Sequence, residues 1–138
     1  MRFPANFIPE KEGGFYVTFP DIPEALTQGD DLEETQHYAE EVLDVAMEFY
    51  LEDRRAVPAP SRAKRGQHMT PLPPGTTAKV LLLNEMLAQK IGAAELAERM
   101  GITPQEVDLL FSTRRLTRID RIDQALRTLG KRLEVRVV

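Results

Sequence analysis

Apolar and polar residues alternate along the first part of the chain, as they do in a half-buried β-strand. Positions 15–19 read Phe-Tyr-Val-Thr-Phe, and an extended apolar segment at 2–9 precedes them across a Gly13-Gly14 pair. An extended apolar segment and an alternating segment on the two sides of a glycine turn predict a β-hairpin. A third short strand is predicted at 25–28, ahead of the chain-breaking Gly29-Asp30 pair.

The spacing of apolar residues becomes helical after Asp31. Asp31 and Glu34 are three residues apart and form a capping pair at a helix start. Apolar residues then recur three and four positions apart: Ala39, Val42, Leu43, Ala46, Met47, Phe49 and Tyr50. We expect this helix to lie across one face of the small sheet.

Prolines and basic residues dominate the next stretch. Five of the ten prolines and five Lys or Arg residues lie between Arg54 and Gly75. This composition predicts a linker that is semi-rigid where prolines cluster. A fourth short strand near His68–Leu72, returning to the first sheet, is the alternative for part of it.

Helical spacing resumes at Thr76 and continues almost to the end of the chain. Helices are predicted at 76–91, 94–100, 103–111 and 119–129. Thr103, Pro104 and Glu106 predict a capping box with Pro in the first turn, and Gly101 is suited to positive φ in the turn before it. The tail, 132–138, alternates as a strand without a partner in the predicted elements.

These elements predict an α+β chain of two modules. The first module, a three- to four-stranded sheet with one helix, covers 1–56, or 1–72 if the fourth strand forms. A Pro-rich linker at 57–75 follows. The second module, 76–138, is an all-α domain with a terminal β-strand.

Charge is distributed unevenly between the two halves. Residues 1–66 hold seven Lys or Arg against fourteen Asp or Glu, whereas 67–138 hold eleven against eight, which gives −7 and +3 within a total of −4. This polarity indicates different partners for the two modules, with the basic one better suited to a polyanion.

Composition also excludes several classes of protein. Without cysteine there is no disulfide framework, thiolate nucleophile or cysteine-based metal site. No apolar run reaches the roughly 18 residues of a membrane helix, and the first residues lack a signal-peptide pattern. We expect a soluble, cytoplasmic protein that does not associate with membranes.

Residues 95–107 contain the motif that indicates what the second module binds. They read Glu-Leu-Ala-Glu-Arg-Met-Gly-Ile-Thr-Pro-Gln-Glu-Val, and 76–130 as a whole resembles the Cro/repressor-like helix-turn-helix family. The resemblance implies that 103–111 is a recognition helix in the major groove of operator DNA. Asp108 and Leu109 replace the small polar and basic residues common there in that family.

The resemblance also implies two groups of DNA-contacting residues. The residues nearest the bases are Thr103, Gln105 and Glu106, and those nearest phosphate are Arg114, Arg115, Thr117 and Arg118. Gln can pair with adenine through two hydrogen bonds, whereas Arg neutralises phosphate whatever the sequence.

Residues 14–30 carry a second resemblance. They read Gly-Phe-Tyr-Val-Thr-Phe-Pro-Asp-Ile-Pro-Glu-Ala-Leu-Thr-Gln-Gly-Asp and precede an acidic helix, which is similar to the HicB antitoxin family. The resemblance implies a partial ribonuclease H-like fold, inhibition of the mRNA-cleaving toxin HicA, and repression of the shared operon. Acidic residues are candidates for binding the basic toxin: Asp21, Glu24, Asp30, Asp31, Glu33 and Glu34.

The sequence predicts no enzyme, cofactor or metal. A ribonuclease H site needs carboxylates that converge on metal ions, one of them usually from the first strand, and 2–9 contain no acid. The only histidines, His37 and His68, fall in different elements and are expected to be ordinary packing or surface residues.

Assembly and two other functions remain open. We expect a homodimer or higher oligomer in which the tails pair through Leu133, Val135 and Val137. One alternative is a one-component transcriptional regulator whose first module senses a small ligand. The other is an enzyme that cleaves nucleic acid with the help of a metal.

Overall fold

The computed structural model describes every residue of the chain except Arg114. It divides into two compact units. The first unit comprises Met1–Phe49 and Pro58–Pro74, and the second comprises Tyr50–Val57 and Gly75–Val138.

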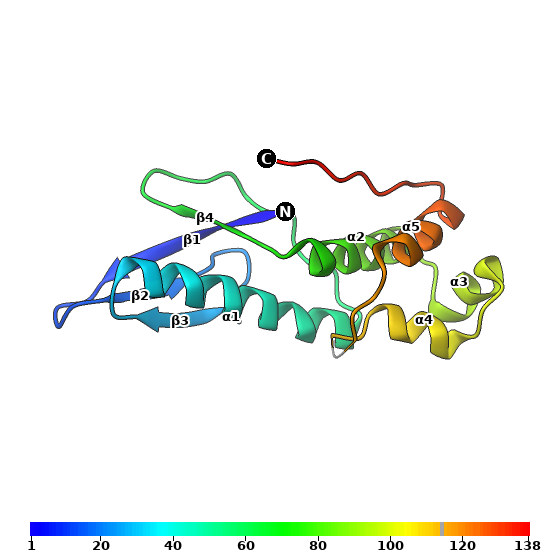
Figure 1. Cartoon of the computed structure of the whole chain (residues 1–138), viewed down its shortest axis with the longest axis horizontal. Coiled ribbons are helices and arrows are strands. Elements are labelled where there is room, and N and C mark those ends of the chain that lie inside the picture. The colour runs from blue at the N-terminus through cyan, green and yellow to red at the C-terminus, as the bar shows by residue number, and fades with distance from the viewer. Residues whose placement is uncertain (114) are drawn as a thin grey trace. The chain divides into compact units, whose positions relative to one another are not determined.

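The first unit contains the predicted antiparallel sheet, with all four strands formed (Figure 1). The strands are β1 (Arg2–Pro9), β2 (Phe15–Thr18), β3 (Leu26–Gly29) and β4 (His68–Pro71), in the order β3-β2-β1-β4. Phe7 lies opposite Val17, and Phe3 lies opposite Thr70. Because side chains alternate across a strand, Phe3, Ala5 and Val17 share one face of the sheet.

The stretch predicted as a linker is partly incorporated into the first unit. It supplies β4, so the alternative of a fourth strand is confirmed. The Asp21 carboxylate accepts hydrogen bonds from the backbone N–H and hydroxyl of Ser61, at 2.8 and 2.6 Å. Gln67 Nε2 donates to Asn6 Oδ1 at 3.0 Å. Polar contacts between distant residues thus hold this segment, which its composition alone did not reveal.

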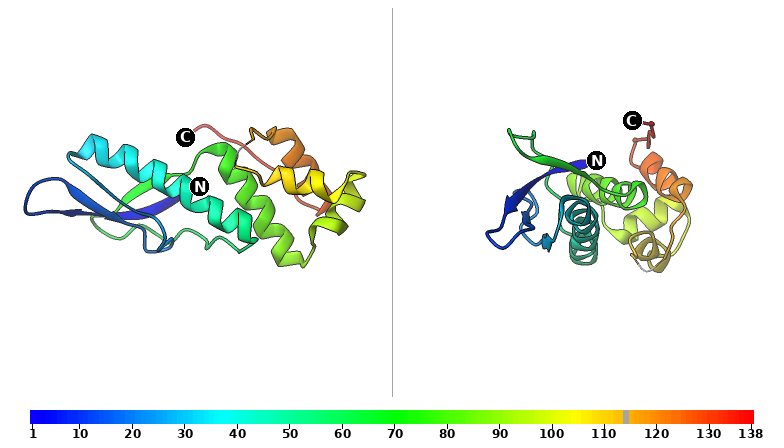
Figure 2. Two further views of the ribbon diagram at one scale, coloured as in Figure 1. Left: turned by 90° about the horizontal axis from the view of Figure 1, so that it is seen from below. Right: turned by 60° about the vertical axis from the view of Figure 1, so that its left-hand side comes forward.

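Helix α1 (Leu32–Asp53) runs along the buried face of the sheet (Figures 1 and 2). The predicted capping pair is confirmed: Asp31 Oδ1 accepts the Glu34 N–H and Glu34 Oε2 accepts the Asp30 N–H, both at 2.8 Å. The core beneath the helix is apolar: Phe3, Ala5, Val17, Phe19, Ile22, Ala39, Leu43, Ala46 and Met47 are buried.

The second unit contains the four predicted helices: α2 (Pro74–Gln89), α3 (Ala93–Met100), α4 (Pro104–Leu110) and α5 (Ile119–Thr128). They surround one core that includes Leu51, Leu82, Leu83, Leu96, Val107, Ile122 and Leu126. Leu82 is buried in this core, whereas Leu81 and Leu87 are exposed. Positions 80–83 are all apolar, so their spacing did not distinguish the faces. No helix among the described residues is long and apolar enough to cross a membrane.

The tail differs from its prediction as a strand. The described residues 131–138 form no helix or strand, because an edge strand needs a second strand to pair with. The Leu133 side chain packs against the core of the second unit, and its N–H donates to Asp123 Oδ1 at 2.9 Å. Val135 and Val137 are exposed.

Gly29, the last residue of β3, lies close to Thr35 in the first turn of α1. A Cβ at this position would lie 2.4 Å from Thr35 Oγ1 and 2.7 Å from Thr35 Cα. We expect Gly29→Ala to lower the free energy of unfolding by about 1–3 kcal/mol through overpacking. Urea unfolding followed by circular dichroism measures the change.

Gly75→Ala is the matched control for this substitution. No described atom lies within 4 Å of a Cβ at Gly75, which is in the first turn of α2. Alanine there should leave stability unchanged or raise it by up to about 1 kcal/mol. Equal losses in the two variants would contradict the packing argument.

Asp123 makes the attachment of the tail dependent on pH. The hydrogen bond from the Leu133 N–H, helped by Arg127 at 2.9 Å, holds the pKa of Asp123 below its ordinary value. The charged form is favoured in the fold, so this stabilisation is present at neutral pH. It is lost as pH falls through the folded-state pKa, below the usual value of about 3.9.

The Leu133 amide resonance should report this titration in an NMR pH series. We expect its acid-induced shift to disappear in Asp123→Asn and to remain in Asp120→Asn, which alters an exposed carboxylate in the same helix. An unchanged titration in Asp123→Asn would show that another group controls the tail.

Candidate functional site

Helices α3 and α4 are joined by a tight turn. Gly101 has φ of 70° and its N–H points to the carbonyls of Ala97 and Glu98, which confirms the predicted positive φ. The Ile102 N–H donates to the Ala97 carbonyl at 3.0 Å. Leu96, Ala97 and Val107 pack in the core between the helices. The turn therefore fixes where α4 begins.

The start of α4 is the predicted capping box. The Glu106 N–H donates to Thr103 Oγ1 at 3.2 Å, and the Thr103 N–H donates to Glu106 Oε2 at 2.8 Å, with Pro104 in the first turn. Thr103 and Glu106 are thus hydrogen-bonded to each other, as the predicted capping box requires. Gln105 is exposed beside them.

A loop of basic residues follows α4. Arg115 and Arg118 are exposed and Thr117 is half-buried, whereas Arg114 lies outside the described residues. The buried ammonium group of Lys79, on α2, donates to the carbonyls of Ser112 at 2.7 Å and Arg115 at 3.3 Å. Lys79 thereby ties the loop to the core.

Lys79 was not identified from the sequence. The one indication of its burial was its position as a single lysine in the otherwise apolar stretch 78–83. A buried lysine must meet acceptors. Which acceptors it meets depends on residues more than thirty positions away.

Arg54 explains an unusual residue of α4. Its guanidinium donates to the Leu51 carbonyl at the end of α1, pairs with Asp108 at 3.1 Å, and lies over the Phe111 ring at 4.5 Å. Asp108 departs from the helix-turn-helix pattern, and in this chain it is the ion-pair partner of Arg54. Both side chains are partly exposed, so the pair contributes at most about 1 kcal/mol.

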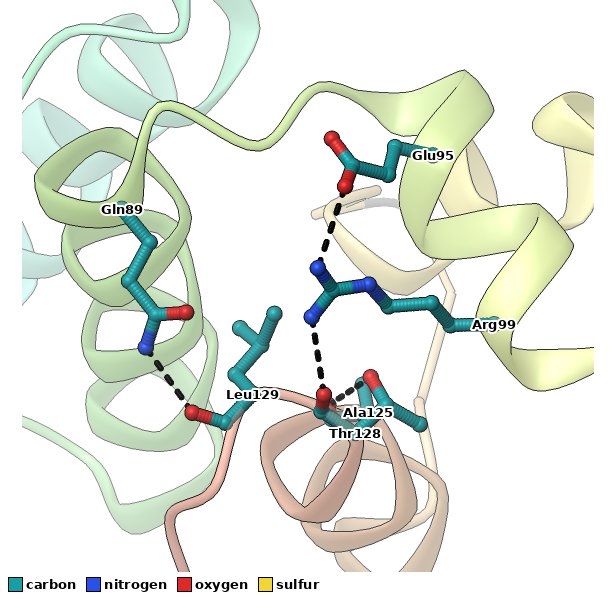
Figure 3. A network of polar contacts seen from close by, with 6 residues as sticks. All are labelled: Gln89, Glu95, Arg99, Ala125, Thr128 and Leu129. Atoms are coloured by element: carbon teal, nitrogen blue, oxygen red, sulfur yellow. Dashed lines mark hydrogen bonds and ion pairs between the residues drawn. The ribbon is translucent and has the colours of Figure 1, made fainter.

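A polar network closes the C-terminal end of α5 (Figure 3). Arg99 donates to the Thr128 carbonyl and pairs with Glu95, both at 3.0 Å, while Gln89 Nε2 donates to the Leu129 carbonyl at 2.9 Å. Helix-terminal carbonyls lack partners within the helix. Side chains from α2 and α3 supply them, which fixes these helices around the core.

The six acidic candidates of the first unit fall into two groups. Asp21, Asp31 and Glu34 hold local structure through their bonds to Ser61 and to the start of α1. The other three are exposed: Glu24, Asp30 and Glu33. Asp21, Asp31 and Glu34 therefore have a structural role beside the binding role expected of them.

The two histidines have local partners. His37 Nε2 lies 3.2 Å from Glu41 Oε1, and the His68 ring stacks on Phe7 with centroids 4.2 Å apart. Among residues 1–113 and 115–138, the structure groups no three His, Asp or Glu side chains in a way that could hold a metal ion.

Comparison with known proteins identifies the family. The model of the family described as HicB-like antitoxin of bacterial toxin-antitoxin systems matches residues 2–81, which are more than half of the chain.

Relatives named antitoxin HicB match over most or all of the chain. Antitoxin HicB 2 of Photorhabdus laumondii is 47% identical over 135 residues, covering 98% of this chain and 95% of the relative. Antitoxin HicB of Escherichia coli K12 is 41% identical over 138 residues and 100% of both chains. Antitoxin HicB of Pseudomonas fluorescens is 33% identical over 125 residues, covering 90% of this chain and 86% of the relative. The chain therefore belongs to the HicB-like family of antitoxins from bacterial toxin-antitoxin systems.

Proposed function

We propose that this antitoxin binds and neutralises a HicA-like, mRNA-cleaving toxin and represses its own operon by binding operator DNA. Membership of the antitoxin family supports the toxin partner. The arrangement of α3, the Gly101 turn and the capped start of α4 supports DNA binding, and it is the single observation that carries the repressor role.

In this proposal α4 is the recognition helix of a helix-turn-helix. Gln105 is exposed at its first turn and has the donor and acceptor needed to pair with adenine. Arg115 and Arg118 are exposed in the loop that Lys79 fastens, where they meet phosphate. Thr103 and Glu106 act on DNA indirectly, because their hydrogen bonds set the position of α4.

The first unit is proposed to hold the toxin. An RNA-cleaving protein must present a basic surface to its substrate, and residues 1–66 carry a net charge of −7. Opposite charges accelerate association and select the partner. Glu24, Asp30 and Glu33 are exposed and are the proposed contact residues.

A homodimer completes the proposal, since a repressor of this type reads two half-sites. Leu133 already packs within its own chain, so the tail contact between protomers would rest on the exposed Val135 and Val137.

Gln105→Ala tests DNA readout. We expect the affinity for the operator to fall by about 1–3 kcal/mol while binding to unrelated duplexes stays the same, because only base contacts carry sequence information. Arg115→Gln should weaken both and lower the salt slope by about one. Fluorescence anisotropy over a salt series measures these changes.

Gln36→Ala is the control for the amide, since Gln36 is exposed on α1. If Gln105→Ala bound operator and unrelated DNA as the wild-type chain does, α4 would not be the reading helix.

The toxin role is tested with the product of the small reading frame beside this gene. Co-expressed with the full chain, that protein should co-purify, and its cleavage of mRNA should stop at a stoichiometric amount of antitoxin. Its failure to co-purify, with cleavage unchanged, would contradict the proposal. Binding of a small metabolite in its place would favour the one-component regulator.

A further inference from the structure

Helix α1 has a second apolar stripe that the sheet does not cover. Tyr38, Val42, Val45 and Phe49 are separated by four, three and four residues and thus lie along one side of the helix. The exposed fractions of Tyr38, Val45 and Phe49 are 36%, 51% and 53%, and Val42 is half-buried. We call these four residues the α1 seam.

The spacing of the seam distinguishes it from scattered surface residues. Single exposed apolar side chains are ordinary on a protein surface. A row in which they alternate three and four apart is the pattern by which one helix packs against another. The buried stripe of the same helix, which includes Ala39, Leu43 and Met47, already serves the core. The seam is therefore additional to what the fold of the first unit requires.

A row of carboxylates flanks the seam. Glu34, Glu41 and Glu48 recur every seven residues and so follow the same side of α1. The Glu34 carboxylate also accepts a hydrogen bond from the Tyr38 hydroxyl, and this bond raises the pKa of Tyr38. The Tyr38 hydroxyl is thus held at the acidic edge of the seam.

Charge decides what can cover the seam. Leu32–Asp53 contains eight Asp or Glu residues and neither Lys nor Arg. A second copy of α1 laid on the seam would bring two helices together that each hold eight carboxylates and neither Lys nor Arg, so they would repel each other. A nucleic acid would be repelled for the same reason. A partner helix with an apolar stripe and basic residues beside it can pack on the seam and pair with the flanking carboxylates.

We propose that the α1 seam and its carboxylate row form the docking surface for a basic amphipathic helix of a protein partner. The proposal rests on the antitoxin function and places the toxin on this side of α1. It adds Tyr38, Val45, Phe49, Glu41 and Glu48 to the contact surface, none of which the sequence predicted as a binding residue.

Calorimetric titration of the purified toxin from the adjacent reading frame into the full-length chain tests the proposal. Val45→Ser combined with Phe49→Ser should weaken binding by at least about 30-fold, as expected for the central side chains of an interface. Both residues are exposed, so circular dichroism and thermal unfolding should show an unchanged fold.

A matched pair of charge reversals separates the seam from general acidity. Glu41→Lys and Glu40→Lys make the same change at adjacent exposed positions, but Glu41 flanks the seam and Glu40 lies on another side of the helix. We expect Glu41→Lys to weaken toxin binding and to reduce its salt dependence much more than Glu40→Lys does. Equal effects would overturn the proposed location.

The outcomes distinguish failure of the seam from failure of the function. If the wild-type chain binds the toxin and the seam double variant binds equally well, the seam is wrong and the antitoxin function remains. If the wild-type chain does not bind, the function fails and the seam loses its partner. If sedimentation equilibrium shows that the double variant dissociates a homodimer while toxin binding is unchanged, the occupant is a second copy and the proposal is overturned.

Discussion

Burial of one stripe of α1 is the constraint on which both units depend. The helix supplies Leu43 and Met47 to the core of the first unit and Leu51 to that of the second. Arg54 follows at its end and makes the ion pair with Asp108 on α4. Because each residue of a helix is rotated by about 100° from the last, a shift of one position would remove all of these side chains from their partners.

Elements defined by local signals were predicted from the sequence almost to their boundaries. The strands were predicted from alternating apolar and polar residues. Both capped helix starts, at Asp31 and Thr103, were predicted from cap residues three positions apart. The Gly101 turn is equally local. Each of these features is stabilised by neighbours within one turn or one strand pair, so the pattern that encodes it is short enough to be recognised.

Contacts between distant residues were not predictable in this way. Asp21 meets Ser61 across 40 residues, Lys79 meets Ser112 across 33, and Arg54 meets Asp108 across 54. A carboxylate in a sequence shows that an acceptor is available without showing which donor it will meet. Asp21 was therefore assigned only to toxin binding, whereas in the structure its carboxylate accepts two hydrogen bonds from Ser61.

The tail shows a second limit of prediction from the sequence. Its alternation predicted a strand, yet an edge strand forms only when another strand pairs with it. Within one chain Leu133 finds the helical core and a hydrogen bond to Asp123, so the first residues of the tail are held while Val135 and Val137 remain exposed.

The separation of charge determines which surfaces the two proposed activities can use. The eight acids of α1 have no Lys or Arg on the same helix to neutralise them, so this surface attracts a basic protein and repels DNA. The exposed Arg115 and Arg118 have the opposite preference. The toxin and the operator would therefore not compete for one surface, since each would be repelled by the charge at the site of the other. A basic partner on α1 would instead cancel negative charge that opposes approach of the chain to DNA. In the proposed function, two small modules of opposite charge would keep the two partners on separate surfaces, whereas a single surface of mixed charge would bind both weakly and in competition.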